Sequence, residues 1–146
     1  MTHFKRMQTL KGRGEESCFL WGPRQVGKTT LLLELFPESP RYNLLLASEA
    51  RRLATNPSLM RQELLASPPG SSPVIIDEVQ KVPELIDEAQ ALIVENQMQF
   101  ILCGSSARKL KRQGANLLGG RALRFELFPL VYPEIQDFDL LRALNH

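Results

Sequence analysis

Short apolar runs recur along the chain and alternate with longer segments of helical character. The runs are 18–21, 42–46, 74–76, 99–103 and 122–128. Most of them are near-continuously apolar, whereas a strand with one face in water alternates apolar and polar residues. The pattern therefore predicts five strands that are mostly buried on both faces, as in a parallel sheet.

The segments between these runs have the spacing and the terminating residues of helices. The expected helices are 29–36, 48–66, 83–93 and 107–118. The second is interrupted near Asn56-Pro57, Pro37 stops the first, and Gly119-Gly120 stop the last. Strands that alternate with helices form βαβ units, so the expected fold class is α/β, with a mainly parallel sheet covered by helices on both faces.

Composition narrows the class of protein. The chain has 146 residues, of which 43% are hydrophobic and 23% charged, as expected for one soluble globular domain. Its formal net charge of +2 is too small to indicate nucleic acid or a membrane surface as a partner. No apolar run reaches the length of a membrane-spanning helix, and the N-terminus lacks the apolar centre of a signal peptide. We therefore expect a cytoplasmic protein.

The cysteines and histidines give little support to a disulfide or to a metal site made of protein ligands. Cys18 and Cys103 each lie inside an apolar run, which favours buried free thiols over a disulfide. His3 and His146 lie at opposite ends of the chain. Without further ligands beside either, neither histidine indicates a metal centre.

A glycine-rich segment follows the first predicted strand and reads GPRQVGKTT over 22–30. It matches the P-loop pattern at every fixed position, and glycines there let backbone N–H groups approach phosphate oxygens. Lys28 would reach the β- and γ-phosphates, the Thr29 hydroxyl would bind Mg²⁺, and Thr30 could reach the α-phosphate. The expected nucleotide-binding residues are Gly22, Pro23, Arg24, Gln25, Val26, Gly27, Lys28, Thr29 and Thr30.

Two adjacent carboxylates follow the third predicted strand. Asp77 would hold Mg²⁺, and Glu78 would activate the water that attacks the γ-phosphate, because neighbouring residues at a strand end point to opposite sides. The alternative is that Glu78 begins a solvated loop. The Asp-x-x-Gly and Asn-Lys-x-Asp motifs of GTP-binding proteins are absent, and a kinase for small molecules has less use for a water-activating carboxylate. ATP hydrolysis is therefore the favoured reaction.

Serines follow the fourth predicted strand, which should lie between the two strands that carry these motifs. A hydroxyl of Ser105 or Ser106 could orient the attacking water or sense the γ-phosphate, and Ser105 is favoured. The alternative is that both serines cap the following helix.

Basic residues follow the fourth predicted strand and are candidates for contacts outside the site itself. Arg121 could reach the γ-phosphate of a neighbouring subunit, with Arg124 as a weaker candidate and a plain surface arginine as the alternative. The helix before Arg121 carries a basic cluster, which is either a solvated face or a contact to DNA or a protein partner. The cluster consists of Arg108, Lys109, Lys111 and Arg112.

Four segments together resemble one known family. GPRQVGKTTLL, VIIDEVQKVPELID, FILCGSSARKLKRQGANLLGGRA and FELFPL are similar to prokaryotic AAA-type ATPases of the archaeal-ATPase-like group, over about residues 4 to 135. The resemblance implies a P-loop NTPase sandwich of three α/β/α layers, whose five-strand sheet has the AAA+ order. It implies these site residues: Lys28 and Thr29 as Walker A, Asp77 and Glu78 as Walker B, Ser105 or Ser106 at the sensor 1 position, and Arg121 at an arginine-finger-like position.

The resemblance also implies a domain organisation. We expect a lead-in segment over 1–16, the P-loop ATPase core over 17–132, and the start of a truncated lid over 133–146. Relatives continue through a helical lid to a further domain, and they carry an acidic residue after the second strand where this chain reads YNLLLASEA.

Three functions remain open. The first is ATP binding with Mg²⁺-dependent hydrolysis, in which a homo-oligomer would supply Arg121. The second is a nucleotide-binding remnant without useful turnover, which a missing lid favours and the presence of Glu78 disfavours. The third is a DNA-associated regulatory ATPase.

Overall fold

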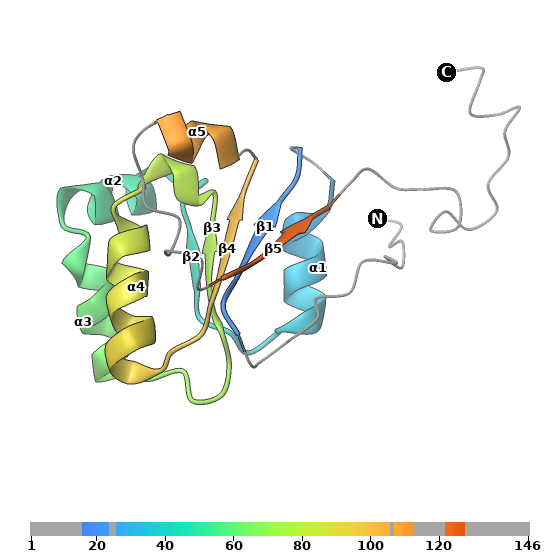
Figure 1. Cartoon of the computed structure of the whole chain (residues 1–146). Coiled ribbons are helices and arrows are strands. Elements are labelled where there is room, and N and C mark those ends of the chain that lie inside the picture. The colour runs from blue at the N-terminus through green and yellow to red at the C-terminus, as the bar shows by residue number, and fades with distance from the viewer. Residues whose placement is uncertain (1–15, 24–25, 106, 113–121, 128–146) are drawn as a thin grey trace, which may run out of the picture.

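A five-stranded sheet, parallel throughout, forms the centre of the molecule in our computed structural model, which describes residues 16–23, 26–105, 107–112 and 122–127 (Figure 1). The strand order is β2-β3-β4-β1-β5. The strands are β1 (Cys18–Trp21), β2 (Arg41–Asn43), β3 (Val74–Asp77), β4 (Phe100–Gly104) and β5 (Leu123–Glu126). The α/β class and the parallel sheet predicted from the apolar runs are confirmed.

Helices cover both faces of the sheet, with α1 on one face and α2, α3 and α4 on the other (Figure 1). The α-helices are α1 (Lys28–Leu35), α2 (Ala47–Thr55), α3 (Ser58–Ala66), α4 (Leu85–Asn96) and α5 (Ala107–Arg112). A 3-10 turn, η1 (Val79–Lys81), follows β3. Among the helices in the described ranges, none is both long and apolar enough to cross a bilayer.

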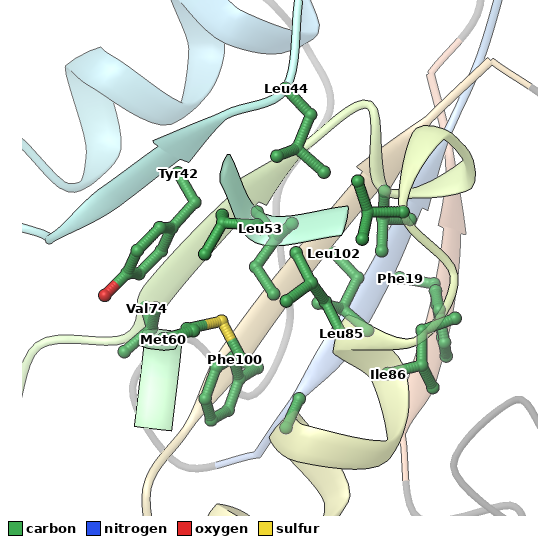
Figure 2. Packing of buried hydrophobic residues seen from close by; sticks show 14 of the residues in the cluster. Phe19, Tyr42, Leu44, Leu53, Met60, Val74, Leu85, Ile86, Phe100 and Leu102 are labelled. Carbon is green, nitrogen blue, oxygen red and sulfur yellow. The ribbon is translucent and has the colours of Figure 1, made fainter. Parts of the chain in front are cut away.

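Alternate residues of each central strand belong to opposite faces and so to two separate cores. Phe19 and Trp21 of β1 pack with the α2, α3 and α4 side, whereas Cys18 and Leu20 pack with α1. The larger core is drawn in Figure 2, where Met60 and Phe100 lie between the helices and the sheet. Because both faces of β1, β3 and β4 are covered, their sequences read as unbroken apolar runs.

The strand order puts the chemically interesting strand ends next to one another. As expected, β4 lies between β3 and β1, and in a parallel sheet the carboxyl ends of neighbouring strands meet at one edge. The edge is tied by backbone hydrogen bonds: Gly22 N donates to Gly104 O at 3.3 Å, and Leu127 N donates to Trp21 O at 2.7 Å. The segments that follow β1, β3 and β4 therefore surround one place.

The interruption predicted near Asn56-Pro57 is confirmed as a full break between α2 and α3. Other predicted boundaries differ from the structure. The second strand ends at Asn43 because its side-chain Oδ1 and its carbonyl accept the N–H groups of Leu45 and Leu46, which turns the chain. Pro83 was expected to open a helix, but it lies in the turn before α4, which begins at Leu85. The rest of the predicted 107–118 helix, beyond Arg112, lies outside the described residues.

Candidate nucleotide-binding site

The glycine-rich segment leaves the centre of the sheet between β1 and α1, and two of its glycines are required by geometry. A Cβ on Gly22 would lie 2.3 Å from the carbonyl oxygen of Leu127, so no larger residue fits beside the end of β5. Gly27 has a φ of 90°, in the left-handed region that glycine adopts without strain. The loop therefore starts in close contact with the sheet and turns sharply into α1.

Lys28 lies at the start of α1 with its side chain buried. Its Nζ donates to the carbonyl of Gly22 at 2.7 Å and to that of Pro23 at 2.8 Å. The side chain therefore points back toward the start of the glycine-rich segment. The first turn of α1 contains no acidic residue, and the helix dipole adds positive potential at the same end. An ammonium held by neutral carbonyls beside a helix N-terminus produces a positive potential, which is the kind of environment that phosphate groups take in proteins.

Thr29 and Asp77, the residues predicted to hold Mg²⁺, are brought together. The Thr29 hydroxyl donates to Asp77 Oδ2 at 2.8 Å, although 48 positions separate the two residues. Asp77 is only 2% exposed, and Arg41 Nη2 donates to the same oxygen at 2.8 Å. A hydroxyl and a carboxylate are hard oxygen ligands of the kind that Mg²⁺ takes, so these residues fit the ion.

A dedicated cage for a metal is not needed at this place. Among the described residues, no group of three or more histidine, cysteine, aspartate or glutamate side chains could hold a metal ion. Mg²⁺ in phosphate-binding sites is commonly held by one or two protein oxygens together with phosphate oxygens. The pair of Thr29 and Asp77 suits that arrangement.

Glu78 follows directly and has a different environment from Asp77. Its backbone is left-handed, with φ 58° and ψ 47°, and its side chain is 6% exposed. Its Oε2 accepts a hydrogen bond from Gln80 Nε2, which also donates to Ser105 Oγ at 3.3 Å. The two adjacent acids thus belong to two hydrogen-bond groups, one with Thr29 and one with Ser105.

Lys28, Thr29 and Glu78 line one cavity of about 490 Å³, which is within the usual size of a small-molecule site. Its lining residues are Gly27, Lys28, Thr29, Thr30, Leu45, Glu78 and Lys81. Residues from both predicted motifs therefore face one space. Leu45 and Lys81 were not predicted, because only the turns after β2 and β3 bring them to this edge.

Besides Lys81, the polar residues Arg41 and Gln80 were also missed by sequence reasoning. Arg41 comes from β2, whose position beside β3 depends on the strand order. Gln80 lies two residues after Glu78, and the left-handed turn at Glu78 directs its amide back to that carboxylate. Residues 79–82 read VQKV, with two polar residues between two valines, so nothing in the sequence distinguishes Gln80 from a residue of a polar turn.

Several predicted residues take no part in the described site. Val26 is 9% exposed and packs in the core under α1, and Arg124 is exposed on β5. Arg108 and Lys109 are exposed on α5. Predicted residues that lie outside the described ranges are Arg24, Gln25, Ser106 and Arg121; of Lys111 and Arg112, only the helical backbone is described.

Both cysteines are free and buried, as predicted. Burial raises the pKa of the Cys18 thiol to about 12 and that of Cys103 well above its usual range. The thiols are therefore uncharged packing groups at neutral pH, without the thiolate that nucleophilic chemistry needs.

Comparison with known proteins identifies the family. The family model described as AAA domain matches residues 14–136, which is most of the chain. A comparison with curated proteins gives no match. The matched region includes the glycine-rich segment, the acidic pair and all five strands. This chain belongs to the AAA domain family and forms a core domain of the AAA-type P-loop ATPases.

Proposed function

We propose that this chain binds ATP with Mg²⁺ in the cavity and hydrolyses the bond between the β- and γ-phosphates. Membership of the AAA family supports nucleotide binding and ATPase activity in general. The observation that carries the proposal is the 2.8 Å contact between the Thr29 hydroxyl and Asp77, with Thr29 lining the same cavity as Lys28 and Glu78. Lys28 would bind phosphate, Thr29 and Asp77 would bind the metal, and Glu78 would activate the water.

Binding begins at the glycine-rich segment. The first N–H groups of α1 have no partner within the helix and can donate to phosphate oxygens. On binding, Lys28 Nζ would leave the carbonyl oxygens of Gly22 and Pro23 and donate to oxygens of the β- and γ-phosphates. Its buried positive charge would then be paired with negative charge. Lys81, which is exposed and lines the same cavity, adds a second positive charge.

The metal would be held by Thr29 and Asp77. When bound, Mg²⁺ neutralises phosphate charge and draws electron density from the transferred phosphoryl group. Asp77 keeps its carboxylate in place through the Thr29 hydroxyl and Arg41.

Hydrolysis is assigned to Glu78 and its neighbours. A water oxygen forms a bond to the γ-phosphorus while the bond from that phosphorus to the bridging oxygen breaks, and ADP leaves. Glu78 accepts the proton of the attacking water, and the Ser105 hydroxyl helps to orient that water. Arg121 of a neighbouring copy would stabilise the charge of the transition state.

Thermal unfolding with and without millimolar MgATP tests nucleotide binding. A ligand at about 100 times its dissociation constant adds roughly 2.7 kcal/mol, which raises the melting temperature of a domain of this size by several degrees. Lys28→Met keeps the apolar stem of the side chain and should lose the shift. Lys109→Met, on the exposed surface of α5, is the matched control and should keep it. No shift in the parent chain would contradict the proposal.

Release of phosphate tests hydrolysis separately. Glu78→Gln keeps the shape of the side chain and should still bind MgATP, whereas its turnover should fall by at least about a hundredfold. Turnover that is equal in Glu78→Gln and the parent would refute the role of Glu78. Binding without turnover in the parent would leave a nucleotide-binding module.

A further inference from the structure

The side chain of Gln80 connects two residues of the site that come from different strands. Its Nε2 donates to Oε2 of Glu78, which follows β3, and at 3.3 Å to Oγ of Ser105, which follows β4. Gln80 itself lies in η1 and is 6% exposed. A single buried amide thus holds the acid that faces the cavity and the serine at the end of the neighbouring strand.

The amide has little freedom to move away from this position. It packs on the backbone of Gly104, where an added Cβ would lie 2.6 Å from Gln80 Oε1. Oε1 is buried and has no hydrogen-bond partner among the residues that the structure describes. Turning the amide over would give this oxygen a place beside Ser105 but would press it against the Glu78 carboxylate. The unpartnered oxygen is therefore the consequence of directing Nε2 at Glu78.

Glu78 also departs from ordinary backbone geometry. It is one of two residues other than glycine with a positive φ in the described part of the chain. The left-handed conformation turns the chain so that Gln80 folds back toward the residue two positions before it. Local strain and an unsatisfied buried oxygen both belong to this three-residue segment, and such features cluster where function requires a particular geometry.

Ser105 has the hydrogen-bonding capacity to extend the connection. A hydroxyl has one donor hydrogen and two acceptor lone pairs, so Ser105 can accept from Gln80 and still donate its own hydrogen. A γ-phosphate oxygen only accepts. The chain of bonds from Glu78 through Gln80 and Ser105 to a γ-phosphate is therefore consistent in every donor and acceptor, and ADP would leave its last donor without a partner.

We infer that Gln80 is a positioning residue that couples Ser105 to Glu78, so that a γ-phosphate at the end of β4 fixes the orientation of the water-activating carboxylate. This inference rests on the proposed function and adds to it a means of distinguishing ATP from ADP. Gln80 itself is not among the residues that line the cavity. Its effect passes through Glu78 on one side and Ser105 on the other.

The test compares nucleotide discrimination in Gln80→Met, Ser105→Ala and the double variant. Titration calorimetry gives the ratio of the MgADP dissociation constant to that of the non-hydrolysable β,γ-imido analogue of MgATP, without any turnover. Loss of one hydrogen bond to a charged group should lower the preference of the parent for the analogue by about tenfold in either single variant. The double variant should lose no more than one single variant, since all three break the same chain of bonds.

Steady-state kinetics provides the second readout. In Gln80→Met we expect kcat to fall by about ten- to a hundredfold with KM changed by less than about threefold, as for a group that aligns a general base. Gln62→Met is the matched control, because Gln62 also donates to a serine, Ser58 Oγ at 3.4 Å, but on the exposed surface of α3. This variant should keep both the ratio and kcat.

The results separate the inference from the proposed function. A parent that binds neither nucleotide overturns both. A parent that binds nucleotide without turnover contradicts the proposed hydrolysis, and the inference is then judged by the ratio of dissociation constants. Gln80→Met with the ratio of the parent, or single effects that add in the double variant, would overturn the inference alone.

Discussion

Arg41 and Asp77 form an ion pair on the carboxylate oxygen that also binds Thr29. Arg41 Nη2 donates to Asp77 Oδ2 at 2.8 Å, and the Thr29 hydroxyl donates to the same oxygen at 2.8 Å. Asp77 is buried, whereas a quarter of the Arg41 side chain is exposed. The negative charge of Asp77 is thus already paired with Arg41, which comes from β2, a strand without any of the nucleotide-binding motifs.

Arg41→Gln should destabilise the protein most when no metal is present. Removing one partner of a buried pair leaves a carboxylate without its opposite charge, and partial exposure reduces the loss to about 1–3 kcal/mol in the free energy of unfolding. Saturating MgATP should recover part of this loss, because a cation then lies beside Asp77. Urea unfolding in EDTA and in MgATP measures both values.

The control for this variant is Arg51→Gln. Arg51 is exposed on α2 and donates to the carbonyl of Ala47. Its replacement should change the free energy of unfolding by less than about 0.5 kcal/mol in either buffer. An Arg41→Gln loss that is equally large in EDTA and MgATP would show that Arg41 acts only as a packing and pairing residue.

Gly22→Ala should cost more than other glycine replacements. Its Cβ would lie 2.3 Å from Leu127 O, a backbone atom that cannot turn aside, and such overpacking costs about 1–3 kcal/mol or more. Gly70→Ala is the comparison, since its Cβ would contact nothing and only its φ of 65° opposes the change. Thermal unfolding should rank Gly22→Ala well below Gly70→Ala, and equal melting temperatures would contradict the close approach of β5.

Tyr42→Phe should change the response of stability to alkaline pH. Burial, and next the hydrogen bond with Glu63, raise the pKa of the Tyr42 phenol above its ordinary value of 10.0. A raised pKa in the folded state means that the unfolded chain releases this proton first. The stability that Tyr42 contributes is therefore complete below pH 10 and is lost as the pH rises toward the folded-state pKa.

The expected result is a crossing of two curves. Near pH 8 Tyr42→Phe should be about 1 kcal/mol less stable than the parent, because it lacks the hydrogen bond to Glu63 at 3.1 Å. By about pH 11 the difference should have closed, since one ionising group changes stability by about 1.4 kcal/mol per pH unit. Urea unfolding at both pH values measures this, and a difference that does not depend on pH would contradict the buried phenol.

Lys81→Gln should weaken ATP binding in a salt-dependent way. Lys81 lines the cavity and is exposed, so its charge contributes through solvent and should raise the dissociation constant by about two- to fivefold. The effect should shrink at high ionic strength, where exposed charges are screened. Titration calorimetry at low and high salt, with Lys109→Gln on α5 as control, decides whether Lys81 faces the bound phosphates.

Sequence patterns predicted the fold well wherever local chemistry determines it. Five apolar runs gave five strands, and the break at Asn56-Pro57 separates α2 from α3. The second strand was predicted too long, because Leu44 to Leu46 are apolar although the turn at Asn43 has already taken them out of the sheet. Apolar character alone does not distinguish a strand from an apolar turn that follows it.

From sequence alone, the residues of the two motifs could be expected to lie close together, whereas their partners could not be identified. Thr29 and Asp77 could be paired in advance because the P-loop pattern and the acidic strand end each imply a metal ligand. Arg41 could not, because its contact depends on β2 lying next to β3. Gln80 depends on the left-handed backbone of Glu78, which a short sequence does not reveal. The role of Arg121 stays a prediction.

Because α1 covers two buried cysteines, the reactivity of these thiols reports whether α1 is packed on the sheet. Among the described helices, α1 is the one that packs on the face holding Cys18 and Cys103, and its first residues belong to the proposed phosphate site. Because α1 covers these thiols, local movement of α1 away from the sheet would expose them to an alkylating reagent. MgATP should therefore slow their alkylation in the parent and leave the rate unchanged in Lys28→Met. Release of nucleotide and exposure of this core face would then occur in the same local opening, and one free energy of opening would describe both.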